Sequence, residues 1–494
     1  SIGEWQSLTL ALQHENLQLV NMPSVVDQLW NEEPNPARRR PEFSKIVANL
    51  HNEQYTGVFW RDKVAAVRNE LVSMGADAMV VTALDEVAWL LNVRGRDLPY
   101  APLLKAFVIV STREVRVYAQ PGKLSMPLRE AVMEYVNIYA DLRRATESKI
   151  LIPTGGTFQR GASAAIVQSV VASKRMFQMS PIIYMKAQKS AAEATGMRKA
   201  HLRDAVAMCT LLSYIEEKKV DITRGTQASY VSLSMRTRVA FGPNGADPDY
   251  SATTLTNRRV FRNSTLIIRS GGQYEEGTTV VTRTLHYGTP SGEERRAYTT
   301  TLRALTALTT LQLPATLPAA HTDPVARAPL WAARQDYPHP TGHGVGAALN
   351  RKEDPVVLDY RQDTILHTLK EGYFITSEPA WYETNKFGVR LGNILEIVSK
   401  PDGFLGFREA TLVPFELKLI DKNSLTEYEV CIYNMVVGPE LTAQGLTKVY
   451  YWMMNKTLPV TMPTKTKNNP SSEAVKTQSM VLMFALCLAT LSLL

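Results

Sequence analysis

The sequence has little of what would assign it quickly to a class of protein. Its 494 residues contain three cysteines, Cys209, Cys431 and Cys487, and no CxxC pair. This count excludes a disulfide-stapled framework and a CxxC metal site, and it leaves the redox compartment open. No internal repeat of 20 to 50 residues is evident, which excludes solenoids and propellers. No apolar run reaches the roughly 20 residues that a membrane-spanning helix needs.

The charge pattern is equally unspecific. The net charge is +8, but lysines and arginines are scattered apart from short clusters such as residues 38–40. Basic residues do not interleave with aromatic ones, and no nucleic-acid motif is present. We therefore interpret the charge as an evenly solvated basic surface and expect no nucleic-acid partner. The 45% hydrophobic and 21% charged residues are typical of a globular protein, and the length predicts two or three domains.

The first half of the chain predicts α/β structure. Residues 1–48 hold a short helical pattern, a strand-like run and the Pro-rich, charged linker NEEPNPARRRPE. From there to residue 190, apolar strand-like runs alternate with amphipathic helical ones, as in residues 62–76 (helix), 77–91 and 105–112 (buried strands joined by a turn or helix).

The pattern of predicted secondary structure changes near Glu193. Residues 191–219 predict one long helix, residues 230–290 a mostly antiparallel region, and residues 293–313 more helix before a strand-rich portion that runs to about 420. The C-terminal portion thus predicts an α+β domain.

One stretch, from Ile267 to Thr284, predicts a β-hairpin. We expect two strands with a tight connection through Gly271 and Gly272. The inward positions of such a hairpin, Arg269 and Val280, would point into one cleft. A metallohydrolase would carry carboxylates at such positions.

The last residues form a separate unit. A polar stretch from Met462 to Gln478 precedes the apolar run VLMFALCLATLSLL, which ends the chain. Small residues, a polar spacer and an apolar tail fit a GPI-anchor signal, with cleavage expected near residues 468–474. A short tail anchor or a buried terminal helix are the alternatives. A GPI anchor predicts a cell-surface protein held at the plasma membrane. Because the chain begins with Ser, we expect a fragment or a processed chain.

Seven stretches, in order along the chain, carry a family resemblance: TALDEVAWLLNVRG (82–95), GMRKAHLRDAVAMC (196–209), GPNGADPDYSA (242–252), SGGQYEEGTTVVTRTLHYGTP (270–290), PTGHGVGAALN (340–350), SEPAWYETNKFGVRLGN (377–393) and LVPFELKLID (412–421). They resemble the eukaryotic aminopeptidase P (Xaa-Pro aminopeptidase) group of the M24 metallopeptidases, whose membrane-attached member is GPI-anchored.

The resemblance implies a multi-domain α/β (α+β) chain of the creatinase/aminopeptidase type with a C-terminal pita-bread domain. The implied parts are residues 1–48 (end of a first α/β domain, and linker), 49–190 (second, creatinase-like α/β domain), 191–420 (pita-bread domain), 421–461 (C-terminal extension) and 462–494 (spacer and tail). A homodimer is a further expectation, because relatives often form one.

The implied activity is removal of an N-terminal residue that precedes proline. Active relatives hold two divalent cations, manganese or zinc, with two aspartates, one histidine and two glutamates. Two cations close together polarise the scissile carbonyl and lower the pKa of a bridging water, while carboxylates offset their charge.

Three of these five ligands are replaced here. The two aspartate positions hold Arg269 and Val280, and one glutamate position holds Gly392. The histidine is retained as His343 and the other glutamate as Glu378. On residues alone, His343 in its Gly-rich turn would be a weak ligand candidate, and Glu378 would be more often a salt-bridge partner than a ligand.

The surrounding pocket is also altered. His339, at a catalytic histidine position, is retained, as are the substrate-binding positions Tyr250 and Arg390. Two further family histidines are replaced by Asp249 and Lys352. Proline-containing peptides remain the expected ligands.

A fixed guanidinium at position 269 opposes metal binding. Two like charges about 4 Å apart repel by about 4 kcal/mol at an effective dielectric constant of 20, roughly a thousandfold in affinity. We therefore expect no bound metal, a Glu378 carboxylate stabilised by Arg269, and a peptide-binding or scaffold protein without activity. The alternative is an active Xaa-Pro aminopeptidase with one metal on His343 and Glu378, helped by Asp249.

Overall fold

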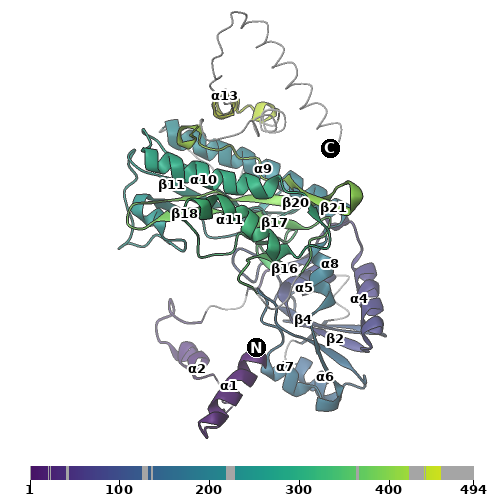
Figure 1. Ribbon diagram of the computed structural model, residues 1–494. Coiled ribbons are helices and arrows are strands. Elements are labelled where there is room, and N and C mark those ends of the chain that lie inside the picture. The colour runs from purple at the N-terminus through teal and green to yellow at the C-terminus, as the bar shows by residue number, and fades with distance from the viewer. Residues whose placement is uncertain are drawn as a thin grey trace, which may run out of the picture.

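The computed structural model describes residues 2–20, 22, 24–40, 44–124, 132–134, 137–217, 229–362, 367–421, 439 and 441–457. Figure 1 shows two mixed α/β bodies, one formed by the purple-to-blue part of the chain and the other by the teal-to-green part. They meet around helices α5 and α8 and strand β16 (Figure 1).

The first body is built on a six-stranded mixed sheet in the order β6-β5-β4-β2-β7-β8. Strand β2 pairs antiparallel with β4 and parallel with β7. The elements of this body are β1 Asn49–Leu50, α3 Glu53–Thr56, α4 Trp60–Met74, β2 Ala78–Val81, α5 Leu84–Leu90, β3 Val93–Arg94, β4 Ala106–Ser111, β5 Val115–Ala119, β6 Val132–Glu134, α6 Ile138–Arg144, β7 Ile150–Pro153, α7 Ala164–Ser169, β8 Arg175–Gln178 and α8 Pro181–Ala187.

Helix α4 illustrates how the sequence produces this body. Val64, Val67 and Leu71 recur at helical spacing and are all buried, so one face of α4 joins the core. The helix ends at Gly75, whose φ of 72° is the left-handed conformation that glycine adopts without strain. The predicted helix is thus confirmed. The run 77–91, predicted as a strand, folds as strand β2 followed by helix α5.

Two helices precede this body. They are α1, Ile2–His14, and α2, Val25–Glu32. Helix α2 has no buried residue, and its Leu29 and Trp30 are exposed.

The second body begins with the 27-residue helix α9, Ala191–Glu217, as predicted. Helices α9 and α10 lie across one side of its sheets, with α11 beside them (Figure 1). A six-stranded sheet in the order β14-β21-β20-β17-β15-β16 and a three-stranded sheet, β10-β11-β13, form a half-barrel of the pita-bread type. The remaining elements are β9 Tyr230–Leu233, β10 Arg238–Phe241, β11 Leu266–Ser270, β12 Gly272–Tyr274, β13 Val281–Leu285, α10 Gly292–Thr309, β14 Leu313–Pro314, α11 Asp323–Ala332, β15 Gly342–Gly344, β16 Glu353–Leu358, β17 Phe374–Ser377, β18 Ala380–Glu383, β19 Phe387–Arg390, β20 Asn393–Ser399, β21 Phe404–Glu409 and α13 Thr447–Lys456.

The prediction of a hairpin is correct for the two paired strands and wrong for the tight connection between them. Strands β11 and β13 do pair antiparallel, with Arg269 opposite Thr282. Between them, however, the chain forms β12, which pairs with β9. Gly271 does not adopt a positive φ. A side chain there would overlap the carbonyl oxygen of Thr279, so the glycine permits close packing of two segments and does not form a turn.

The loop that follows His343 is held by the first body. Arg94 donates from Nε to the carbonyl oxygen of Ala348 and from Nη2 to that of Ala347. Gln273 donates to the carbonyl oxygens of Tyr100 and Leu349. These bonds tie residues 347–349 to both bodies and fix the segment that leads to Arg351 and Lys352.

Several predictions concern residues outside the described ranges. These are the apolar tail, its GPI signal, and the cysteines Cys431 and Cys487. Cys209 is described and is a buried free thiol. Within the described residues, no helix combines the length and apolar character needed to cross a membrane.

Candidate functional site

Glu378 is the centre of the site. It follows β17, and its backbone N–H donates to the carbonyl oxygen of Thr341 at 2.7 Å, which anchors it beside β15. Its side chain is buried, with 4% of the residue exposed. The Nη2 atom of Arg269, on β11, donates to Oε1 and Oε2 of Glu378 at 2.9 and 2.8 Å. The Nη2 atom of Arg390, at the end of β19, donates to Oε2 at 2.5 Å.

These two guanidinium groups fix the charge of Glu378. Burial would raise the pKa of the carboxyl, but Arg269 and Arg390 hold this pKa well below its usual range. Burial lowers the pKa of Arg269 to about 10, so it stays protonated at neutral pH. The predicted pairing of Arg269 with Glu378 is present, and Arg390 adds a second cation to it.

His343 lies beside this ion pair on β15. Its Nδ1 is 2.9 Å from the carbonyl oxygen of Gly344, a bond that requires a proton on Nδ1. The Nε2 atom then carries the lone pair; it lies 3.5 Å from Nη1 of Arg351 and 4.0 Å from Oε1 of Glu378. Burial lowers the pKa of His343 to about 3, so the ring is neutral. A neutral imidazole with a free Nε2 is a metal donor, but a guanidinium already faces this atom.

His339 is engaged in a different way. Its Nδ1 is 2.9 Å from the carbonyl oxygen of Pro340, and its Nε2 is 2.9 Å from the hydroxyl of Tyr382. With a proton on Nδ1, Nε2 accepts the hydrogen of Tyr382. Burial and Arg390 hold the pKa of His339 well below its usual range. The ring is therefore neutral, and its one lone pair is occupied.

Two of the replaced ligand positions carry no polar side chain. Val280 is buried in an apolar cluster with Met197 and Phe374. Gly392 forms a bridge with Thr282, and a Cβ atom placed on it would lie 2.9 Å from Oγ1 of Thr282. A longer side chain at 392 therefore requires Thr282 to shift.

Two more cations lie near Glu378. Arg351 and Lys352 follow the loop after β15, and the pKa of each is lowered by burial and by the neighbouring arginines. The Nζ atom of Lys352 lies 5.6 Å from the ring centroid of Phe158, and that ring packs edge-on against His343. Lys352 is thus placed beside the site, as its motif position predicted.

The structure does not bring Asp249 and Tyr250 into this group. The side chain of Asp249 is 96% exposed, and its ion-pair partner is Arg238 at 3.5 Å. The hydroxyl of Tyr250 donates to the carbonyl oxygen of Thr256 within its own loop.

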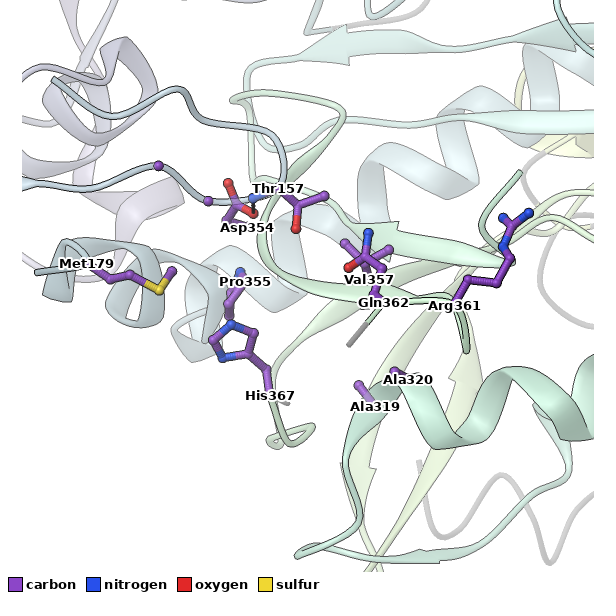
Figure 2. A pocket seen from close by; sticks show the side chains of 12 residues that line it. Thr157, Met179, Ala319, Ala320, Asp354, Pro355, Val357, Arg361, Gln362 and His367 are labelled. Atoms are coloured by element: carbon purple, nitrogen blue, oxygen red, sulfur yellow. Dashed lines mark hydrogen bonds between the residues drawn. The ribbon is translucent and has the colours of Figure 1, made fainter. Parts of the chain in front are cut away.

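A separate cavity of about 530 Å³ lies on another part of the second body, where it meets the first. Figure 2 shows Asp354 beneath Thr157, with Met179 and His367 on one side and Ala319 and Ala320 on the other. The Asp354 carboxylate accepts the backbone N–H groups of residues 157–159, and Arg361 is paired with Asp359. The charged side chains of Asp354 and Arg361 are thus already engaged, and none of the predicted site residues lines this cavity.

Comparisons with known proteins agree with this architecture. Residues 39–193 match the creatinase/prolidase N-terminal domain, residues 183–399 metallopeptidase family M24, and residues 403–460 the C-terminal region of peptidase M24. The chain is similar to the crystal structure of X-prolyl aminopeptidase from Caenorhabditis elegans, a cytosolic enzyme with a di-nuclear active site. The TM-score is 0.84 at 28% identity, and the match covers 92% of this chain and 79% of that one.

Named relatives agree as well. Xaa-Pro aminopeptidase 1 of Dictyostelium discoideum is 33% identical over 470 residues, which are 88% of this chain and 73% of the relative. This chain belongs to the Xaa-Pro aminopeptidase family. Xaa-Pro aminopeptidase 2 of Homo sapiens is 30% identical over 500 residues, 93% of this chain and 72% of the relative.

The dinuclear metal site implied by the family does not fit the residues present. Within the part of the chain that the structure describes, no group of three or more His, Cys, Asp or Glu side chains could hold a metal ion. The two retained donors, His343 and Glu378, each face an arginine. A catalytic zinc normally has three protein ligands, and a dication would have to displace a charged hydrogen-bonded partner.

Sequence reasoning missed two residues of this Xaa-Pro aminopeptidase homologue. Arg351 lies directly before the replaced histidine position, and its cationic side chain beside the Gly-rich loop was an available signal. Tyr382 connects His339 to Arg390, whose Nη1 is 3.4 Å from its hydroxyl. Nothing in the sequence indicated that role, because it depends on the pairing of β18 with β19.

Proposed function

We propose that this chain is a member of the Xaa-Pro aminopeptidase family that lacks peptidase activity and uses the retained fold to bind a ligand. The observation that carries the proposal is the Arg269 guanidinium, which bonds both oxygens of Glu378. The oxygens that would hold a metal are engaged by a group that does not deprotonate at working pH.

Charge balance supports this proposal. Arg269 occupies an aspartate position, so two dications would meet a fixed cation where the family supplies an anion. Val280 and Gly392 supply no carboxylate to offset the dications. The family's metals activate water and polarise the scissile carbonyl, and no described group of three or more His, Cys, Asp or Glu side chains could hold such metals. His339, whose Nε2 already accepts from Tyr382, has no free lone pair to act as a base.

The alternative is an active enzyme with a single metal. In this alternative one metal lies on His343 and Glu378, helped by Asp249. The exposure of Asp249 and its pairing with Arg238 give this alternative no support.

The natural ligand class for a binding role is peptides, because the family acts on proline-containing peptides. Arg390 donates directly to Glu378, and the hydroxyl of Tyr382 links His339 to Arg390. A binding protein needs this frame but not the metals.

The test uses one folded preparation for two measurements. After dialysis against chelator and reloading with Mn²⁺ or Zn²⁺, elemental analysis is expected to find less than one metal per chain. Release of the first residue from an Xaa-Pro-Pro peptide is expected to stay at the no-enzyme rate. Metal-dependent release by the same folded protein would overturn the proposal.

We also propose attachment to the cell surface through the C-terminal signal in residues 462–494. Full-length chain expressed on cells should be released by phosphatidylinositol-specific phospholipase C. A version truncated after residue 461 is the control and should be found in the medium. Full-length protein that stays on phospholipase-treated cells would contradict this attachment.

A further inference from the structure

The charges around Glu378 do not balance. Arg269 and Arg390 bond the carboxylate directly, and Arg351 and Lys352 lie close enough to act on it electrostatically. Both histidines are neutral. Among the described residues, four cations therefore face one carboxylate, an excess of about three positive charges. Arg269 and Arg390 are buried, whereas the other two cations lie toward the solvent.

Two of these cations, Arg269 and Arg390, each have an N–H group without a hydrogen-bond partner among the described residues. Arg269 is 9% exposed and Arg390 7%, yet the Nε–H group of each is buried without a hydrogen-bond partner among the described residues. Buried donors in folded proteins nearly always have a partner, so two such groups in one place require an explanation. Glu378 does not provide it, because its three bonds with these arginines all come from the Nη2 atoms.

Arg351 and Lys352 lie on the side of the cluster from which a ligand can approach. Arg351 is partly exposed and contacts only Nε2 of His343 at 3.5 Å. Lys352 is exposed, and its ammonium makes only the ring contact with Phe158. Neither has a carboxylate partner in the described part of the chain, so an incoming anion meets free N–H donors before it reaches the buried pair.

We propose that this basic cluster, defined as Arg269, Arg351, Lys352 and Arg390, is a binding site for an oxyanion group of a ligand. The inference rests on the proposed function, because it requires that no dications occupy the site. Guanidinium groups recognise carboxylate and phosphate through paired hydrogen bonds, and the excess charge is offset when such a group enters. The same charge disfavours a free α-amino group, so the ligand enters with its anionic end.

Binding of inorganic phosphate, and of succinate as a dicarboxylate, tests the proposal. Calorimetric titration at constant ionic strength, with chloride as the blank, gives the dissociation constant for each anion. Preference for phosphate points to a phosphorylated ligand and preference for succinate to an acidic one. Saturable one-to-one binding of either supports the site. Absence of saturable binding of both overturns it.

Matched variants show where the anion binds. Lys352→Ala and Arg351→Ala should each weaken binding about tenfold, since one charge near an anion at intermediate dielectric is worth about 1.4 kcal/mol. Arg296→Ala, on the exposed face of α10, is the control and should bind like wild type. Equal affinity in all four proteins would place the anion elsewhere and overturn the proposal.

Glu378→Gln provides a gain of function that a nonspecific surface effect would not produce. The change removes the competing carboxylate and frees both arginines, so phosphate should bind about tenfold more tightly. An unchanged or weaker affinity in this folded variant would contradict the site. Failure of the proposed function is separate: peptide cleavage by an anion-binding protein would overturn inactivity alone, and an inactive protein that binds no anion would overturn this inference alone.

Discussion

The molecule contains two buried charge clusters that differ in balance. One cluster, which we call the joint, lies where the two bodies meet and consists of Asp85, Glu86, Lys186, Lys189 and Glu353. Lys186 is 2.8 Å from Glu353 and 3.1 Å from Asp85, and Lys189 also pairs with Glu353. Burial raises the pKa of the neighbouring Glu86 to about 8, so this carboxyl is neutral at pH 7. Two lysines thus meet the two carboxylates of Asp85 and Glu353.

Around Glu378, four cations meet one carboxylate. Uncompensated buried charge costs several kcal/mol per ion, so a cluster that serves only stability is expected to be neutral, as the joint is. The basic cluster departs from that rule at the positions where the family resemblance predicts metal ligands. Charge balance thus distinguishes a structural network from the proposed binding site in the same chain.

The largest effect is expected from removal of the central carboxylates. Glu378→Ala leaves Arg269 and Arg390 without their carboxylate. Glu353→Ala leaves Lys189 without its carboxylate, while Lys186 keeps Asp85. Each change should lower the free energy of unfolding by about 3–5 kcal/mol. Denaturant unfolding measures both, with the exposed Glu293→Ala as a control that changes little. Added phosphate should restore stability to the Glu378 variant only. Equal rescue of both would remove the distinction between the clusters.

Carboxylates introduced at positions 269, 280 and 392 test whether the missing negative charge alone accounts for the expected lack of metal binding. The triple variant Arg269→Asp, Val280→Asp, Gly392→Glu should bind Mn²⁺ at least a thousandfold more tightly than wild type, about 4 kcal/mol. No single one of these three substitutions should be enough to produce this gain in Mn²⁺ affinity. The aspartate at 280 enters an apolar cluster, and the glutamate at 392 requires Thr282 to move. Competition with a chelating dye measures the affinity, and a triple variant that folds but binds no metal would show that the frame itself has changed.

The joint should respond to pH through Glu86. Burial raises its pKa to about 8 in the folded state from the ordinary glutamate value of 4.5. The folded chain therefore binds the proton more tightly, and stability falls as pH rises from about 4.5 to 8, by up to about 1.4 kcal/mol per pH unit. Glu86→Gln removes this dependence, so its stability relative to wild type should rise from pH 5 to pH 8 in thermal unfolding. A constant difference would contradict the assignment. Ser180, which donates to Glu86 at 2.6 Å, supplies the control variant Ser180→Ala, which keeps the carboxyl.

The smallest effect is expected at Tyr382. Tyr382→Phe removes the hydroxyl between His339 and Arg390 and should cost about 1 kcal/mol of stability. It should also raise the pKa of His339 very little, because burial dominates that shift. Histidine NMR titration checks this expectation. A His339 that titrates near pH 6.5 in the variant would show that the hydroxyl, and not burial, keeps the ring neutral.

Much of the fold followed from local pattern. Periodic apolar residues predicted α4 and α9 because helical spacing places them on one face. The connection between β11 and β13 was wrong because the glycines there serve a contact with Thr279 that is distant from any turn. Local pattern cannot reveal such a close approach.

The sequence by itself determined that the chain carries Arg269, Val280 and Gly392, the positions at which its family resemblance predicts metal-binding carboxylates. It also determined that a fixed cation would lie near Glu378, since a guanidinium keeps its proton. Only the tertiary structure decided that Arg390 and Arg351 join that cation, and that Asp249 lies apart. The physical reason is that identity and intrinsic charge belong to a residue, whereas an excess of charge exists only where several strands and loops bring residues together in a place that water cannot fully screen.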